Sequence, residues 1–255
     1  MAWIEGIRGV LLDVDGTLLH GDHAIPGAGE ALLRLKRKNV GYRLITNTTR
    51  RPRAAVAKVL RDAGVEVAEE DVLTPAVLAR RRILETGRRR AALLVQDSTK
   101  EDFEGVEVDN EDPQWVVIGD LGPGFTWERM NQAFRWLMDG AALLALHRNR
   151  WWHAGERGLL IDAGAFVAGL EYASGVIAEV VGKPSSGFFQ LALSSLELSS
   201  REVLMVGDDV LNDGRGAAQA GCRTAMVRTG KFRDEDLRRE SFQPDLLLKS
   251  IDDLL

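Results

Sequence analysis

The chain has 255 residues, of which 45% are hydrophobic and 28% are charged, so it can form one large domain or two of ordinary size with a substantial core. Its net charge of −5 argues against nucleic acid as the main partner. No apolar run reaches about 18 residues and the first residues lack the pattern of a signal peptide, so we expect no membrane partner. Cys222 is the single cysteine, which excludes an internal disulfide and suits a cytoplasmic location.

Short apolar runs alternate with helical patterns at both ends of the chain. Continuous apolar runs without polar alternation are typical of strands buried on both faces of a parallel sheet. In chain order we predict a strand at 9–16, a helix at 27–38, a strand at 42–49, a helix at 52–63, a strand at 178–184, a helix at 185–198, a strand at 202–210, a helix at 212–221, and strands at 224–230 and 244–250. This alternation predicts an α/β fold with a doubly wound, Rossmann-like parallel sheet.

The interval between residues 47 and 183 is far longer than one crossover helix requires. It contains its own strand candidates at 91–96, 114–120, 141–149 and 158–164, and helical patterns at 74–87, 126–140 and 165–175. Thr74 followed by Pro75 is a typical helix start. We therefore predict an inserted α/β domain at 75–178, carried by a core made of 1–74 and 179–255.

Polar side chains follow four of the predicted core strands. They are Asp13 and Asp15, then Thr46 and Asn47, then Lys183, and finally Asp208, Asp209 and Asp213. Ligands of open parallel sheets bind beyond the carboxyl ends of the strands, so we expect these groups to converge. The spacing of Asp13 and Asp15 lets both carboxyl groups point to one place if the strand continues.

Acids combined with one lysine and small polar donors suit Mg²⁺ holding a phosphate group. A carboxylate can attack phosphorus to give an aspartyl phosphate, and a second acid can protonate the leaving oxygen. Asp209 and Asp213 have an alternative interpretation, because either could simply cap the helix that follows.

The motifs DVDGT (13–17), TN (46–47), GKP (182–184) and GDDVLND (207–213) occur in an order that resembles the haloacid dehalogenase superfamily phosphatases. The insertion resembles the C2 cap of subfamily IIA, which includes NagD. The stretches 134–152, 166–175, 178–189 and 227–233 are similar to the phospholysine phosphohistidine inorganic pyrophosphate phosphatase group. The similarity covers nearly the whole chain.

The resemblance implies a role for each motif residue. Asp13 would be the nucleophile and a magnesium ligand, and Asp15 would be the acid/base residue and a ligand through its backbone carbonyl. Asp208 would be the third magnesium ligand. The phosphoryl-binding residues would be Thr46, Asn47 and Lys183, with Asp209 and Asp213 in the outer shell of the metal.

Within the insertion, residues 161–166 resemble the segment that determines substrate specificity in the family. We expect Asp162, Gly164, Ala165 and Phe166 near the leaving group, together with Arg150. The resemblance also implies a homodimer formed through the cap.

The leading hypothesis is a magnesium-dependent phosphatase that hydrolyses small phosphorylated compounds through an aspartyl phosphate. Phosphate monoesters are the default substrates, with phosphoramidates or pyrophosphate as alternatives. A phosphotransferase or mutase would use the same intermediate and stays open. A non-catalytic signalling module phosphorylated on aspartate is a third reading, but the long insertion and Asp15 argue against it.

Overall fold

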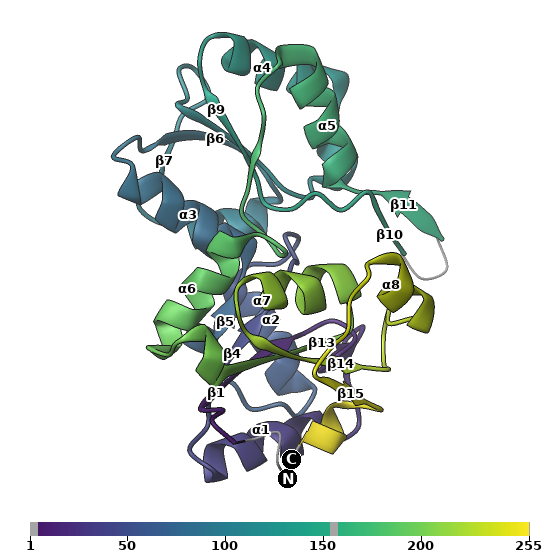
Figure 1. The fold of residues 1–255 in the computed structure, drawn as a ribbon. Coiled ribbons are helices and arrows are strands. Elements are labelled where there is room, and N and C mark those ends of the chain that lie inside the picture. The colour runs from purple at the N-terminus through teal and green to yellow at the C-terminus, as the bar shows by residue number, and fades with distance from the viewer. Residues whose placement is uncertain (1–4, 154–157, 255) are drawn as a thin grey trace. The chain divides into compact units, whose positions relative to one another are not determined.

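The computed structural model describes residues 5–153 and 158–254 (Figure 1). The chain divides into two compact units. The core unit comprises Met1–Thr46, Arg53–Leu73 and Lys183–Leu255, and the insert unit comprises Asn47–Pro52 and Thr74–Gly182. The sequence predicts a catalytic core at 1–74 and 179–255 and a cap at 75–178. These two functional assignments stay predictions.

The core unit is built on a six-stranded sheet in which all paired strands are parallel. From one edge to the other it contains β15 (Leu246–Leu248), β14 (Arg223–Val227), β13 (Val203–Gly207), β1 (Gly9–Asp13), β4 (Gly41–Ile45) and β5 (Val72–Leu73). All residues of β1 and β13 are buried, and Leu12 aligns with Val206 on one side and Leu44 on the other. The central strands are therefore apolar throughout because both of their faces are covered.

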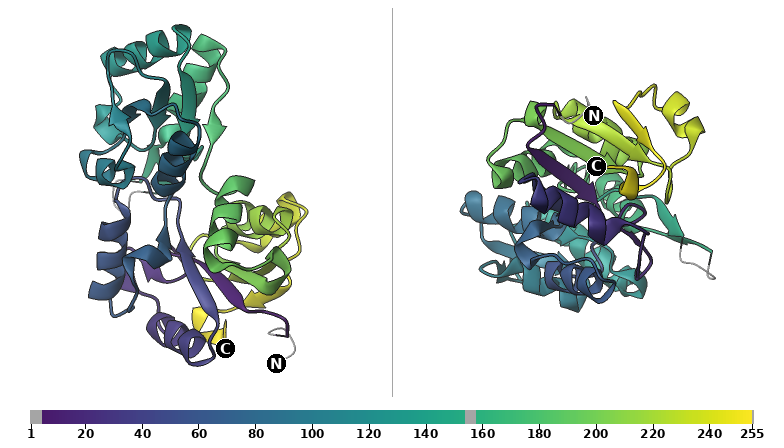
Figure 2. Two further views of the ribbon diagram at one scale, coloured as in Figure 1. Left: turned by 90° about the vertical axis from the view of Figure 1, so that its left-hand side faces the viewer. Right: turned by 90° about the horizontal axis from the view of Figure 1, so that it is seen from below.

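Helices cover both faces of this sheet (Figure 2). The left view shows the purple and blue helices α1 (Ala28–Arg37) and α2 (Arg53–Asp62) on one side of the strands and the green helices α6 (Ser186–Leu196) and α7 (Gly216–Gln219) on the other. Leu32, Leu35 and Leu60 pack with Val10 and Leu12 in one hydrophobic cluster. The predicted α/β, doubly wound class is confirmed.

Smaller elements complete the core unit. They are the hairpin β2 (Leu19–His20) with β3 (His23–Ala24), the helix α8 (Asp234–Arg239), the 3₁₀ turns Glu69–Asp71, Ser200–Glu202 and Ile251–Leu254, and a π-helical turn at Val210–Arg215. This turn is where the sequence predicts the start of a helix, and regular α-helix begins only at Gly216.

The insert unit has its own five-stranded parallel sheet. Its strand order is β12 (Glu179–Val180), β9 (Ala142–Ala145), β8 (Trp115–Ile118), β6 (Arg90–Leu94) and β7 (Glu107–Val108). The helix α3 (Pro75–Glu85) packs on one face, and α4 (Trp127–Met138) and α5 (Ala163–Ser174) pack on the other. As predicted, Thr74 caps α3 and Pro75 is its first residue.

The predicted strand at 158–164 does not join this sheet. Leu159–Ile161 (β11) pairs in antiparallel fashion with Trp151–His153 (β10), and α5 begins at Ala163 with Asp162 as its cap. Irregular 3₁₀ turns lie at Asp97–Phe103 and Gly122–Gly124. Across the described ranges, no helix is both long and apolar enough to cross a membrane.

Candidate active site

The first motif lies where β1 ends. Asp13 is the last residue of that strand and is buried, whereas the side chain of Asp15 is exposed. Gly16 has a φ of 87°, a conformation that favours glycine, and it turns the chain immediately after the two acids. Thr46 follows β4 and donates from Oγ1 to Asp15 Oδ2 over 3.4 Å. The predicted convergence of β1 and β4 at one edge of the sheet is present.

Lys183 connects the first motif to the last. Its Nζ donates to Asp13 Oδ1 (2.5 Å), to Asp213 Oδ1 (2.7 Å) and to the carbonyl oxygen of Ile45 (3.2 Å). The lysine side chain is only 3% exposed. One buried cation thus lies between two buried carboxylates, an arrangement in which the ionic partners replace water.

Asp208 is the first residue after β13 and is also buried. Its Oδ2 accepts a hydrogen bond from the backbone N–H of Lys231 over 2.6 Å. Its Oδ1, by contrast, is buried without a hydrogen-bond partner within the described part of the chain. An unpartnered buried carboxylate oxygen is costly and indicates a missing ligand.

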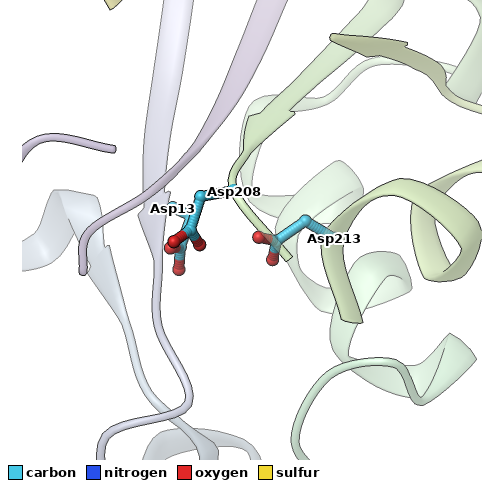
Figure 3. Close-up of side chains that lie close together, drawn as sticks. All are labelled: Asp13, Asp208 and Asp213. Atoms are coloured by element: carbon cyan, nitrogen blue, oxygen red, sulfur yellow. The ribbon is translucent and has the colours of Figure 1, made fainter. Parts of the chain in front are cut away.

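The carboxyl groups of Asp13, Asp208 and Asp213 form a compact acidic cluster (Figure 3). Each contributes one oxygen, and these three oxygens all lie within 4.8 Å of one another. Figure 3 shows the carboxyl groups of Asp13 and Asp208 side by side, with that of Asp213 directed toward them. Hard oxygen donors of this kind fit Mg²⁺, and the free Oδ1 of Asp208 supplies a ligand atom with no competing bond.

Asp209 takes a different role from the other acids. Its Oδ1 accepts from the backbone N–H groups of Leu211 (3.1 Å) and Asn212 (2.9 Å), so it caps the π-helical turn. Asp213 lies at the inner side of the same turn, and its Oδ2 accepts from the backbone N–H of Asp209 over 3.0 Å. Asp209 therefore caps the turn and Asp213 is in the cluster, whereas a place for either in the outer shell of a metal ion stays a prediction.

The cluster changes the acidity of its members. Burial raises the pKa of Asp208 to about 8, and the charges of Asp13 and Asp213 add to the effect. Burial likewise raises the pKa of Asp213 to about 7 and that of Asp13 above its usual value, against the opposing influence of Lys183. Burial alone would lower the pKa of Lys183, but its two carboxylate partners raise it above the usual range. A bound cation would offset this excess of negative charge.

The loop after β14 completes the surroundings of Asp208. It lies within the stretch 227–233, which carries part of the family resemblance, but none of its residues was predicted to belong to the site. A Cβ on Gly230, or on Gly16, would collide with the carboxyl group of Asp208. Thr229 Oγ1 donates to the carbonyl oxygen of Gly16 over 2.5 Å and joins the two loops. The available signal was the position of Thr229 and Gly230 at the end of a fifth predicted core strand.

The motif residues Thr46 and Asn47 belong to different compact units. Thr46 is buried in the core unit, together with Asp13, Asp15, Lys183 and the acids after β13. Asn47 belongs to the insert unit. There a Cβ on Gly182 would meet Asn47 Oδ1 and the carbonyl oxygen of Leu146, so the absence of a side chain at Gly182 permits this close approach.

The residues predicted near the leaving group have several structural contacts within the insert unit. Asp162 is buried and accepts from the backbone N–H of Ala163 over 2.7 Å as the cap of α5. The N–H of Gly164 donates to the carbonyl oxygen of Asn149 over 3.0 Å, and a Cβ at Gly164 would collide with this backbone.

Phe166 stacks on Phe125, with 3.8 Å between ring centroids and an interplanar angle of 12°. Ala165 and Arg150 are exposed. Packing and capping therefore account for Asp162, Gly164 and Phe166 within the unit, and a contact of any of the five with substrate stays a prediction.

Known proteins resemble this chain over nearly its full length. The family described as haloacid dehalogenase-like hydrolase matches residues 10–109, and the family described as HAD-hydrolase-like matches residues 180–254. The bovine (Bos taurus) phospholysine phosphohistidine inorganic pyrophosphate phosphatase is 40% identical over 253 residues, covering 96% of this chain and 92% of that protein. The chain belongs to the haloacid dehalogenase-like hydrolase family.

Other relatives cover the same extent. Human haloacid dehalogenase-like hydrolase domain-containing protein 2 is 38% identical over 98% of this chain and 95% of its own. The crystal structure of 4-nitrophenylphosphatase from Thermotoga maritima superimposes with a TM-score of 0.92 at 30% identity, covering 98% of this chain and 97% of that one. NagD from E. coli K-12 gives 0.88 at 27% identity, covering 96% and 97%. Within the family the protein is a subfamily IIA member and a phosphatase.

Proposed function

We propose that the protein is a magnesium-dependent phosphatase that hydrolyses small phosphorylated compounds through an aspartyl phosphate on Asp13. The observation that carries the proposal is the contact of Lys183 Nζ with Asp13 Oδ1 at 2.5 Å, beside the cluster formed with Asp208 and Asp213. Relatives that match this chain over almost its full length are named as phosphatases, which supports the same reaction class.

Asp13, Asp208 and the backbone carbonyl of Asp15 would hold the magnesium ion, with Asp213 beside them. When bound, the ion supplies positive charge against the phosphoryl oxygens. Lys183 provides a second positive charge at the nucleophile, and Thr46 and Asn47 are the donors for the remaining phosphoryl oxygens. Charge stabilisation of this kind accounts for most catalysis of phosphoryl transfer.

The reaction divides into two displacements at phosphorus. In the first, a carboxylate oxygen of Asp13 bonds to phosphorus while the bond to the leaving oxygen breaks, and Asp15 delivers a proton to that oxygen. In the second, Asp15 takes a proton from water, whose oxygen bonds to phosphorus as the Asp13–phosphorus bond breaks. Before substrate binds, the hydrogen bond from Thr46 holds the Asp15 carboxyl group at this edge of the sheet, and the same hydroxyl group would then turn to a phosphoryl oxygen.

Two substrate classes share this chemistry. The first class is phosphate monoesters, which include the nitrophenyl phosphate in the name of the Thermotoga maritima enzyme and release an alcohol or a phenol. The second class is phosphoramidates, which release an amine. The name of the bovine relative favours phosphoramidates, and also pyrophosphate, as substrates. Transfer of the phosphoryl group to an alcohol, a homodimer formed through the insert and a cytoplasmic location stay predictions.

The experiment is phosphate release from a panel of phosphate monoesters, phosphoramidates and pyrophosphate, with Mg²⁺ and with EDTA. Asp13→Asn should abolish release, whereas Asp62→Asn, which alters an exposed acid paired with Lys58, should leave it unchanged. An alcohol acceptor included in a parallel series separates hydrolysis from transfer. Full activity of Asp13→Asn would exclude Asp13 as the nucleophile.

A further inference from the structure

Residues 47–52 follow a core strand in sequence but pack with the insert unit. Thr49 is almost completely buried there. A Cβ on Gly119 would meet the side chains of Thr49 and Val95. Gly119 comes directly after β8 and Val95 directly after β6, so Thr49 lies at the carboxyl edge of the insert sheet, between the ends of these two strands.

This place is the switch point of the insert sheet. The chain leaves β6 for β7 on one side, whereas β8, β9 and β12 follow on the other. The residues after β6 and after β8 lead to opposite faces, because Phe103 packs with the α3 cluster and α4 packs on the other face. The carboxyl ends of the strands at a switch point are where open parallel sheets usually bind ligands. In this protein Thr49 of the same chain lies at that point.

Three contacts fix Thr49 at the switch point. Its Oγ1 accepts from the backbone N–H of Asp120 over 2.9 Å, and its carbonyl oxygen accepts from Thr99 Oγ1 over 3.0 Å. The imidazole of His147, which follows β9, lies with Nε2 3.2 Å from Thr49 Oγ1. Thr99 and His147 are themselves buried, so these bonds form where water does not compete.

The orientation of the His147 ring follows from its other nitrogen. Nδ1 accepts from the backbone N–H of Asn149 over 3.2 Å, which assigns the proton of the neutral ring to Nε2. Nε2 is therefore a donor toward Thr49 Oγ1, with Asp162 Oδ1 at 3.7 Å on the same side. Asp162 is fixed in turn by the N-terminus of α5.

From this arrangement we infer that Thr49 and His147 are positioning residues for Asn47, two residues before Thr49 in the chain. The inference rests on the proposed function, in which Asn47 binds a phosphoryl oxygen. Thr46 is held by the core unit and Asn47 by the insert unit, so the two neighbouring donors have separate supports. Thr49 and His147 supply the support for Asn47.

The test compares variants that differ only in the polar contact. Thr49→Val keeps the shape of the side chain and loses the hydroxyl, and Thr49→Ser restores it. His147→Leu removes the Nε2 donor, and His147→Gln offers an amide donor in its place. Thr126→Val is the matched control, because it removes a hydroxyl of the same unit that caps α4 by accepting from the backbone N–H of Arg129.

For Thr49→Val and His147→Leu we expect the KM for p-nitrophenyl phosphate and the inhibition constant of inorganic phosphate to rise together by about tenfold, with a smaller change in kcat. Thr49→Ser and His147→Gln should recover much of the loss. Amide hydrogen exchange within 47–52 should be faster in Thr49→Val and His147→Leu than in the wild-type protein. Thr126→Val should change neither the two constants nor this exchange.

Two results would separate the hypotheses. If the wild-type protein releases phosphate and both constants stay unchanged in Thr49→Val and His147→Leu, the positioning role is wrong while the proposed function stands. If folded, magnesium-loaded wild-type protein neither releases phosphate from p-nitrophenyl phosphate nor binds inorganic phosphate, the proposed function fails. Asn47 would then have no phosphoryl group to bind. Constants that rise equally in Thr126→Val would also overturn the inference, because the effect would then be general destabilisation.

Discussion

Lys183 donates to Asp13 across 2.5 Å, and neither side chain is more than 8% exposed. The whole insertion lies between these residues in the sequence. Asp13 is the last residue of the core strand β1, whereas the strand before Lys183 is β12 of the insert sheet. The same ammonium group also contacts Asp213. Its removal would therefore leave two carboxylates buried without their cation.

The first prediction concerns Lys183→Met. The change keeps most of the volume and removes the charge, so we expect a loss of about 3 to 5 kcal/mol in the free energy of unfolding of the magnesium-free protein. Phosphate release should fall at least about a thousandfold. Urea unfolding and turnover measure the two effects. Lys58→Met, which removes a cation from an exposed pair with Asp62, should alter stability by less than about 1 kcal/mol. Equal losses in both variants would refute the role of Lys183.

The second prediction concerns pH in the absence of metal. Folding raises the pKa of Asp208 from 3.8 to about 8, so between these values the folded protein binds a proton that the unfolded chain has released. Stability in EDTA should therefore be greatest at the acidic end of this window and fall as the pH rises toward 8. Added Mg²⁺ should raise the melting temperature more at pH 8 than at pH 5.5, because the ion binds the ionised carboxylates.

Melting curves across this range, with EDTA and with Mg²⁺, check the second prediction. Asp208→Asn removes one of the titrating groups and should make the fall in stability with pH in EDTA less steep, while Asp213, with a pKa of about 7, still contributes to it. A wild-type profile that rises from pH 5.5 to 8 in EDTA would contradict the assignment.

A third prediction concerns the glycine that borders the acidic cluster. In Gly16→Ala the new methyl group would collide with the carboxyl group of Asp208, and the φ of 87° adds backbone strain. We expect at least about a tenfold loss of Mg²⁺ affinity, measured by calorimetric titration. Gly21→Ala is the matched control, since Gly21 has a φ of 62° but nothing within 4 Å of its Cβ position. Equal Mg²⁺ affinity of the two variants would show that Asp208 tolerates the methyl group.

A fourth prediction concerns Gly182, next to Lys183. Its Cβ position is occupied by the carbonyl oxygen of Leu146 and by Asn47 Oδ1, so Gly182→Ala should displace Asn47. We expect a KM for p-nitrophenyl phosphate raised about tenfold, which steady-state kinetics would measure. Gly169→Ala, in an open part of α5, should keep the KM and add up to about 1 kcal/mol of stability. Unchanged kinetics of Gly182→Ala would place Asn47 outside substrate binding.

The sequence was sufficient to predict five of the six core strands, which are β1, β4, β13, β14 and β15. Continuous apolar runs identify strands buried on both faces, and parallel strands bring their carboxyl ends to one edge, so Asp13, Asp15, Thr46 and Asp208 could be grouped from the sequence. The predicted core strand at 178–184 was wrong: only Glu179–Val180 is a strand, and this strand (β12) pairs with β9 in the insert sheet, so Lys183 reaches the site from a segment that follows an insert strand. The sixth core strand, β5, was not predicted.

Asp209 and Asp213 could not be distinguished in this way. Their places depend on the π-helical turn at Val210–Arg215, in which Asp209 caps the start and Asp213 returns to the cluster. A helical pattern in the sequence does not reveal such a local widening of the helix. The assignment of 47–52 to the insert unit was equally hidden, because Thr49 makes its contacts with residues far along the chain.

The boundary between the two units has a consequence for how such enzymes diversify. Of the four points at which the chain crosses it, two lie inside sequence motifs, between Thr46 and Asn47 and between Gly182 and Lys183. A recombination event that exchanged only 75–178 would pack the sheet of another protein against residues 47–52 of this one. An exchange that keeps the contacts of Thr49 would therefore have to include the short segment 47–52 together with the insert.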